Sequence, residues 1–160
     1  MGDIMRKTLL MMAVAVITLI GFVETSSAQP FTFTSTNAAD PVTNGVMTPD
    51  GMVGSVQLQS NGASDFADGT SEAWTSACLN FASTQTADDV NGYCITTMEG
   101  TGDILNVAHV CQNIGNAEDG NLNCWGVFAG GTGKYAKANG TITWRATPDG
   151  ASGGGNLNTE

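Results

Sequence analysis

The chain has 160 residues, a length that suits one domain. It contains 15 acidic and 5 basic residues, which give a formal net charge of −10. This acidic balance provides no basic surface for a phosphate backbone, which argues against nucleic-acid binding. Hydrophobic residues make up 41% of the chain, too large a share for an intrinsically disordered protein.

The first predicted element, residues 1–28, is a secretory signal peptide. Arg6 and Lys7 provide a basic start, residues 8–23 are almost wholly apolar, and Ser26-Ser27-Ala28 offers the small residues that a signal peptidase reads. The alternative is a membrane anchor, but the apolar stretch is shorter than the roughly 20 residues that span a bilayer. We therefore predict cleavage after Ala28, a secreted or periplasmic location, and no membrane association after cleavage.

The rest of the chain indicates an all-β fold. Seven candidate strands are separated by turns, at residues 31–36, 52–59, 72–81, 93–99, 104–111, 122–129 and 141–146. Pairs such as Asn61-Gly62 and Asn139-Gly140 accept the positive φ of tight turns, and no segment has the length and period of an amphipathic helix. Several short strands of this kind predict a sandwich or a barrel. Residues 147–160, which include three consecutive glycines, are predicted to be a flexible tail outside the core.

All four cysteines follow the predicted signal peptide. An even number of cysteines in an exported chain favours disulfides. Residues that face each other across a hairpin lie at equal distances from its turn. One polar, turn-like stretch lies midway between Cys78 and Cys94, and another lies midway between Cys111 and Cys124. We therefore predict the disulfides Cys78–Cys94 and Cys111–Cys124. The alternative, a zinc site that uses His109 with Cys111, is disfavoured by the single histidine and the lack of a Cys-x-x-Cys pair.

Two predicted strands are apolar on both faces. In residues 104–111 and 122–129, neither alternating set of side chains is plainly polar. A strand that is covered on both faces needs a second layer outside the sheet. That layer can be another subunit, which predicts a homo-oligomer, or a loop or tail that folds over the strand.

The glycine-rich segment 126–144 matches neither of two nucleotide-binding motifs. Gly133-Lys134 is followed by Tyr135, where a P-loop needs Ser or Thr, and Phe128 stands where that motif needs Gly. Only 24 residues follow Ala136, which leaves no room for the second strand and the acidic residue of a dinucleotide-binding fold.

The same segment, with its flanking strands, carries a resemblance to a known family. The residues concerned are Gly130-Gly131-Thr132-Gly133, Tyr135, Ala138 and Gly140, together with the upstream turn Glu99-Gly100-Thr101-Gly102-Asp103-Ile104-Leu105. This pattern resembles the allene oxide cyclase and dirigent barrel superfamily, including its secreted bacterial members. The resemblance implies a small closed antiparallel β-barrel of about eight strands over residues 29–146, commonly trimeric, with an apolar cavity and no cofactor.

The chemistry of that superfamily does not carry over residue by residue. Plant cyclases act through a cavity Glu, and no residue here matches it, although Glu72 and Glu99 lie on or beside predicted strands. Dirigent proteins often carry Arg before the last motif glycine, where this chain has Asn139. Arg145 is predicted to be a surface charge.

We therefore predict a secreted barrel that binds a small apolar molecule in its cavity, with no metal ion. The predicted ligand-binding residues are Trp74, Trp125, Phe128 and Trp144. A structural role is predicted for Cys78, Cys94, Cys111, Cys124, Gly130, Gly131, Gly133 and Gly140. The alternatives are a cofactor-independent isomerase or cyclase of allene oxide cyclase type, and a structural secreted oligomer. A single histidine and the lack of a nucleophile turn disfavour a conventional hydrolase.

Overall fold

The structure is a computed structural model that describes residues 28–49, 51–83, 89–114 and 120–160. Apart from Ala28, the predicted signal peptide lies outside the described residues. Among the described residues, no helix is long and apolar enough to cross a membrane.

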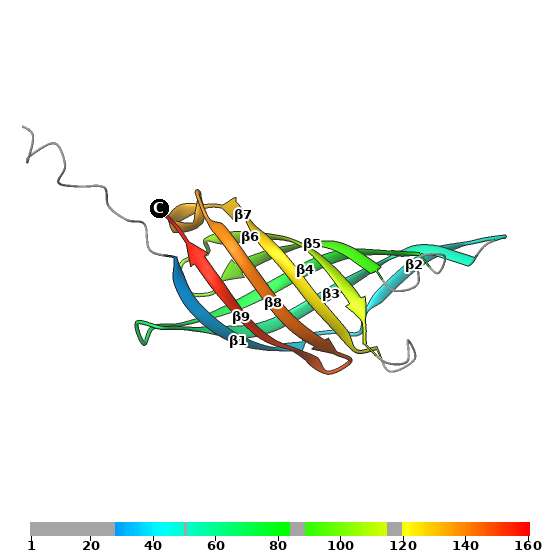
Figure 1. Cartoon of the computed structure of the whole chain (residues 1–160), viewed down its shortest axis with the longest axis horizontal. Helices are drawn as coiled ribbons and strands as arrows, with labels where there is room; N and C mark the ends of the chain where they lie inside the picture. The colour runs from blue at the N-terminus through cyan, green and yellow to red at the C-terminus, as the bar shows by residue number, and fades with distance from the viewer. Residues whose placement is uncertain (1–27, 50, 84–88, 115–119) are drawn as a thin grey trace, which may run out of the picture.

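The described residues form nine strands and a short 3-10 helix. In chain order these are β1 (Gln29–Asn37), β2 (Val42–Thr48), β3 (Gly51–Phe66), β4 (Ser71–Ser83), β5 (Asp89–Met98), β6 (Ile104–Asn113), β7 (Leu122–Gly131), η3 (Gly133–Tyr135), β8 (Asn139–Thr147) and β9 (Gly150–Asn158). The strand order is β1-β9-β8-β7-β6-β5-β4-β3-β2, and an added pairing of β1 with β3 closes eight strands into a barrel (Figure 1). The predicted all-β antiparallel barrel is therefore confirmed.

The barrel closes through the long strand β3. The second half of β3 pairs with β1, from Phe31 opposite Phe66 to Asn37 opposite Ser60. Its first half pairs with β2, and this hairpin extends beyond the end of the barrel (Figure 1). The predicted strand 52–59 is thus only part of β3, and β2 was not predicted.

Side chains alternate between the barrel interior and the outer surface, as the two-residue period of a strand requires. In β6, Leu105, Val107, His109 and Cys111 are buried and point inward. In β7, Cys124, Gly126 and Phe128 do the same. An eight-stranded barrel is just wide enough for side chains to fill, so these inward residues form the core.

The two predicted disulfides are confirmed. Cys78 lies directly opposite Cys94 across β4 and β5, and Cys111 lies opposite Cys124 across β6 and β7. Each pair is bonded, with an S–S distance of 2.00 Å, and the described residues contain no free cysteine. Closing loops of this length typically stabilises a fold by about 3 kcal/mol.

The prediction that residues 147–160 form a tail outside the core is wrong. Residues 150–158 form β9, which pairs with both β8 and β1, and Leu157 is only 5% exposed in the hydrophobic core. The sequence hides this strand because glycine has low β propensity and gives no apolar alternation. Glycine is nevertheless needed here, since a Cβ on Gly153 would collide with the carbonyl oxygen of Thr143 and lie 2.6 Å from the Cβ of Trp144.

This close approach predicts that Gly153→Ala destabilises the barrel by about 1–3 kcal/mol, the usual effect of overpacking. The matched control is Ser152→Ala on the exposed face of the same strand, which should change stability by less than about 0.5 kcal/mol. Chemical denaturation of both variants measures the difference. Equal stability of the two variants would contradict the packing described for β9.

Candidate functional site

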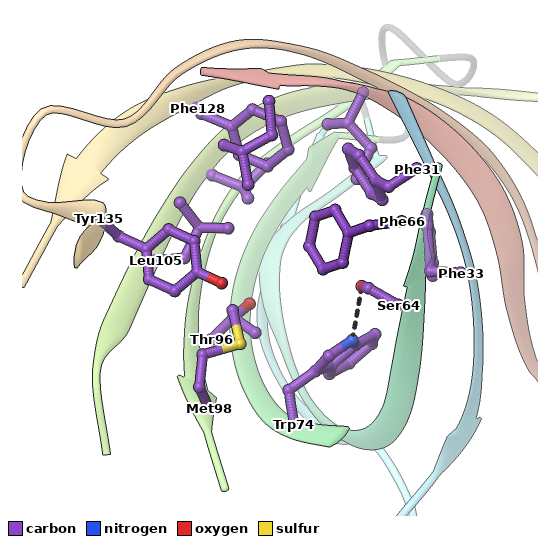
Figure 2. Close-up of a pocket in the computed structure, with 13 residues that line it drawn as sticks. Phe31, Phe33, Ser64, Phe66, Trp74, Thr96, Met98, Leu105, Phe128 and Tyr135 are labelled. Carbon is purple, nitrogen blue, oxygen red and sulfur yellow. Dashed lines mark hydrogen bonds between the residues drawn. The ribbon is translucent and has the colours of Figure 1, made fainter. Parts of the chain in front are cut away.

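The barrel interior contains two small adjoining cavities. The first has a volume of about 50 Å³ and is lined by aromatic side chains, including Phe31, Phe66, Phe128 and Tyr135 (Figure 2). The second has a volume of about 110 Å³. Both are lined by Phe33, Trp74, Thr96, Val107 and Ile142, so they lie next to each other along the barrel.

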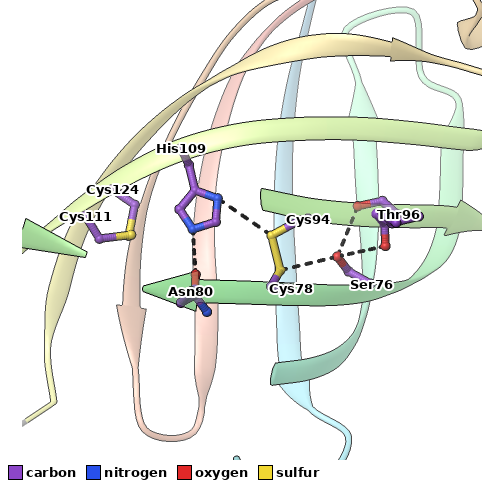
Figure 3. Close-up of a disulfide and its surroundings, with 9 residues drawn as sticks. Ser76, Cys78, Asn80, Cys94, Thr96, His109, Cys111 and Cys124 are labelled. Carbon is purple, nitrogen blue, oxygen red and sulfur yellow. Dashed lines mark hydrogen bonds between the residues drawn. A yellow bond between two sulfur atoms is a disulfide. The ribbon is translucent and has the colours of Figure 1, made fainter. Parts of the chain in front are cut away.

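The second cavity combines rings with hydroxyl groups. Trp74 and Trp144 contribute indole rings, and the Cys78–Cys94 disulfide forms part of the wall. Hydroxyl groups come from Ser35, Ser60, Ser76 and Thr96. The Ser76 and Thr96 oxygens are hydrogen-bonded at 3.1 Å (Figure 3). This cavity therefore offers a few polar contacts within an otherwise apolar surface.

Three of the four predicted ligand-binding residues line these cavities. Trp74 lines both, Phe128 lines the first and Trp144 lines the second. Trp125 does not, because it is 44% exposed on the outer face of β7. Its neighbours Cys124 and Gly126 point inward, so strand alternation sends Trp125 outward. The sequence left this choice open, since both faces of the strand are apolar.

The two interior tryptophans fit because each lies over a glycine on a neighbouring strand. Trp74 is paired with Gly62, where an added Cβ would lie 2.5 Å from the indole ring. Trp144 is paired with Gly153, where an added Cβ would lie 2.6 Å from the Trp144 Cβ. The Trp74 Nε1–H donates to the Ser64 Oγ at 3.0 Å, which fixes the ring at the cavity wall (Figure 2).

His109 lies in the core near the second cavity. It is 7% exposed and is paired with Gly92 on one side and Gly126 on the other, both of which leave space for the imidazole. Its Nε2 is 2.8 Å from the Asn80 Oδ1, which only accepts hydrogen bonds, so Nε2 carries the proton (Figure 3).

The other side of the imidazole meets sulfur and an aromatic ring. Nδ1 lies 3.8 Å from the Cys94 Sγ, and the Trp144 ring packs edge-on at a centroid distance of 5.2 Å. Burial lowers the pKa of His109, which keeps the imidazole neutral. Cys111 is bonded to Cys124 and has no thiolate to offer, so the alternative zinc site is not formed.

A second polar cluster closes the end of the first cavity. Tyr135, in η3, is 1% exposed, and its hydroxyl donates to a Glu72 carboxylate oxygen. The Lys134 ammonium group binds the other oxygen of the same carboxylate. Burial and the contact with Glu72 raise the pKa of Tyr135, so its hydroxyl stays protonated. In the sequence, Tyr135 stands out only as the aromatic residue of the glycine-rich motif, and no pattern indicates its contact with Glu72.

The two segments that carry the family resemblance meet beside this cluster. The Ile104 amide donates to the Thr132 Oγ1 at 2.8 Å, and the Lys134 amide donates to the Asp103 Oδ2 at 3.3 Å. Gly133 has a φ of +53°, and a Cβ there would collide with the Asp103 carboxylate. Glycine is therefore required where the turn approaches Asp103.

Comparison of this chain with protein-family models, curated proteins and solved structures finds no match. The resemblance to the allene oxide cyclase and dirigent superfamily therefore stays a prediction.

The burial of neutral His109 predicts a stability that depends on pH. The unfolded chain binds a proton with a pKa near 6.5, whereas the folded chain does so only at lower pH. The contribution of neutral His109 to the free energy of unfolding is thus present above about pH 6.5. It falls on acidification by at most about 1.4 kcal/mol per pH unit. Denaturation between about pH 7.5 and 5 measures the slope.

His109→Gln is the matched variant, since its amide can still donate to Asn80. His109 is the only histidine in the chain, so most of the slope above about pH 5 should disappear in this variant. An unchanged slope would show that another group causes the pH dependence.

Proposed function

We propose that this protein binds a compact, neutral, largely apolar molecule in the barrel interior, between Trp74 and Trp144. The observation that carries the proposal is the pair of adjoining cavities, which are lined by rings and a few hydroxyl groups. Binding sites for small molecules commonly combine apolar walls with a small number of polar groups.

The cavity volumes limit the size of the ligand. A pocket for a drug-sized molecule measures roughly 300–1,000 Å³, whereas an apolar cavity of about 150 Å³ binds benzene or xenon. The larger cavity here measures about 110 Å³ and adjoins one of about 50 Å³. A single ring with one or two substituents suits this space, and a fatty-acid chain does not fit unless side chains move.

The lining favours a neutral ligand. No Asp, Glu, Lys or Arg is among the described residues that line the two cavities. Burying an unpaired charge in such surroundings is strongly unfavourable. The Ser76 and Thr96 hydroxyls can still bind one carbonyl or hydroxyl group of the ligand.

We also propose that the protein functions outside the cytoplasm. Two disulfides are typical of secreted and periplasmic proteins. The predicted signal peptide points to the same location.

One observation favours the alternative, a cofactor-independent isomerase or cyclase. The Tyr135 ring lines the first cavity, and its protonated hydroxyl contacts Glu72 at the cavity end. A phenol and a carboxylate placed in this way can stabilise charge that develops on a bound, reactive ligand. This alternative shares the cavity with the binding function and adds a chemical step.

The binding proposal predicts that compact ring compounds, such as benzene or toluene, bind saturably and change tryptophan fluorescence. Trp144→Leu removes a ring from the cavity wall and should weaken binding at least about fivefold, which corresponds to about 1 kcal/mol. The matched control is Trp125→Leu, which removes the exposed indole and should leave affinity unchanged.

Fluorescence titration together with thermal stabilisation measures this binding. Long-chain fatty acids serve as the size control and should bind more weakly than single rings. The proposal is wrong if no compound in the ring series gives a saturable signal or raises the Tm. Equal effects of the two tryptophan variants would place the site elsewhere.

The isomerase alternative predicts turnover of a bound ligand, in addition to binding. Ligand recovered after long incubation should be rearranged, and Tyr135→Phe should slow this rearrangement by about 10²-fold or more while binding is retained. Chromatography of the recovered ligand makes the measurement. Ligand recovered unchanged after incubation with the unmodified protein would rule out catalysis of that compound.

A further inference from the structure

The exposed large hydrophobic side chains are confined to one side of the molecule. All ten such residues in the described part of the chain lie on β2, β3, β4, β5 and β7, and none lies on β8, β9 or β1. The outward positions of β8, β9 and β1 are mostly Thr, Ser and Asn, for example Thr34, Thr143 and Ser152. The outer surface of the barrel is thus apolar on one side and polar on the other.

Strand register joins most of these side chains into one surface. One row across the sheet runs Leu79, Tyr93, Ala108, Val127, and the next runs Phe81, Asn91, Val110, Trp125. Ile95 lies beside Tyr93 on the same face of β5, and Val46 and Val53 extend the surface onto the β2–β3 hairpin. We call this surface the apolar wall.

The apolar wall exposes a large area. Phe81 is 55%, Tyr93 40% and Trp125 44% exposed, so each of these aromatic side chains leaves roughly 100 Å² in contact with water. Among the aliphatic members, Ile95, Val127, Val46 and Val53 are 46–70% exposed, whereas Ala108 and Val110 are exposed to smaller fractions. The total approaches the roughly 800 Å² that one partner buries in a standard interface, and exceeds the largest patch of a typical monomer, roughly 300–600 Å².

Charge is arranged so that two copies can meet at this wall. Within residues 71–82, 90–98, 104–113 and 122–131, no outward-facing side chain is charged, although the chain carries a net charge of −10. The described acidic side chains, such as Asp65, Asp68 and Glu99, lie in turns or near strand ends. Like charges therefore oppose end-to-end association but not contact between two apolar walls.

We propose that the apolar wall is an interface with a second copy of this chain. Contact of the same wall on both copies gives a closed, symmetric dimer, the commonest form of homo-oligomer. In these rows the rings of Tyr93 and Trp125 lie next to the shorter side chains of Ala108 and Val110, so the rings of a second copy can pack against those shorter side chains. The interface covers the outer faces of β6 and β7, the two strands whose sequences are apolar on both faces.

The test is the oligomeric state of the protein expressed from its full sequence. Sedimentation velocity should show a dimer at tens of micromolar, and the trimer that the family resemblance implies would overturn this self-complementary contact. Tyr93→Glu places a charge inside the wall and Trp125→Glu places one at its β7 edge, and each should raise the dissociation constant at least about tenfold. Thr34→Glu, on the polar side of the barrel, is the matched control and should leave the assembly unchanged.

Circular dichroism and the absence of reactive thiols verify that each variant keeps its fold. A monomer at tens of micromolar would overturn the proposal. Equal assembly of the Trp125→Glu and Thr34→Glu variants would overturn it as well. Binding of a monomeric protein to phosphatidylcholine vesicles, lost in Trp125→Glu, would instead assign the wall to a lipid surface and contradict the proposal.

Discussion

The narrow interior of a closed eight-stranded barrel is the constraint on which the other features of this protein depend. Side chains from eight strands converge there, so a large ring fits most easily where a neighbouring strand has no side chain. Trp74 lies over Gly62, Trp144 lies over Gly153, and His109 lies between Gly92 and Gly126. Ring and glycine positions are therefore matched across strands, and the two cavities are the space that remains.

The same constraint explains why the interior is nearly uncharged. The buried imidazole is kept neutral by desolvation and hydrogen-bonds to Asn80, and the Tyr135 hydroxyl is kept protonated. The Glu72 carboxylate lies at the end of the barrel, where Lys134 balances its charge. Ionised groups thus stay at the ends, and the middle of the barrel remains uncharged.

Features that depend on local pattern could be predicted from the sequence. The symmetric spacing of Cys78 and Cys94 about a turn gave the correct disulfide, because antiparallel pairing fixes which residues face each other. Each of the seven predicted strands overlaps an observed one. The closed barrel was expected from the resemblance of the glycine-rich turn, and the strand order confirms that architecture.

Features that depend on contacts between distant segments could not be predicted. The Gly-rich strand β9 lacks apolar alternation, and its need for glycine becomes visible only once Trp144 and the β8 backbone lie against it. Trp125 faces outward because of the register of β7, and both faces of that strand are equally apolar in the sequence. The contact between Tyr135 and Glu72 joins residues 63 positions apart, with no shared motif.

The central claim, that the barrel interior keeps apolar space between matched rings and glycines, is tested most directly by a crystal structure determined under xenon pressure. Xenon enters cavities that are apolar and empty of water. The account predicts a xenon atom among Phe33, Trp74, Val107 and Ile142, where the two cavities meet. Side chains that fill this space, or ordered waters bound there to Ser76 and Thr96, would contradict it.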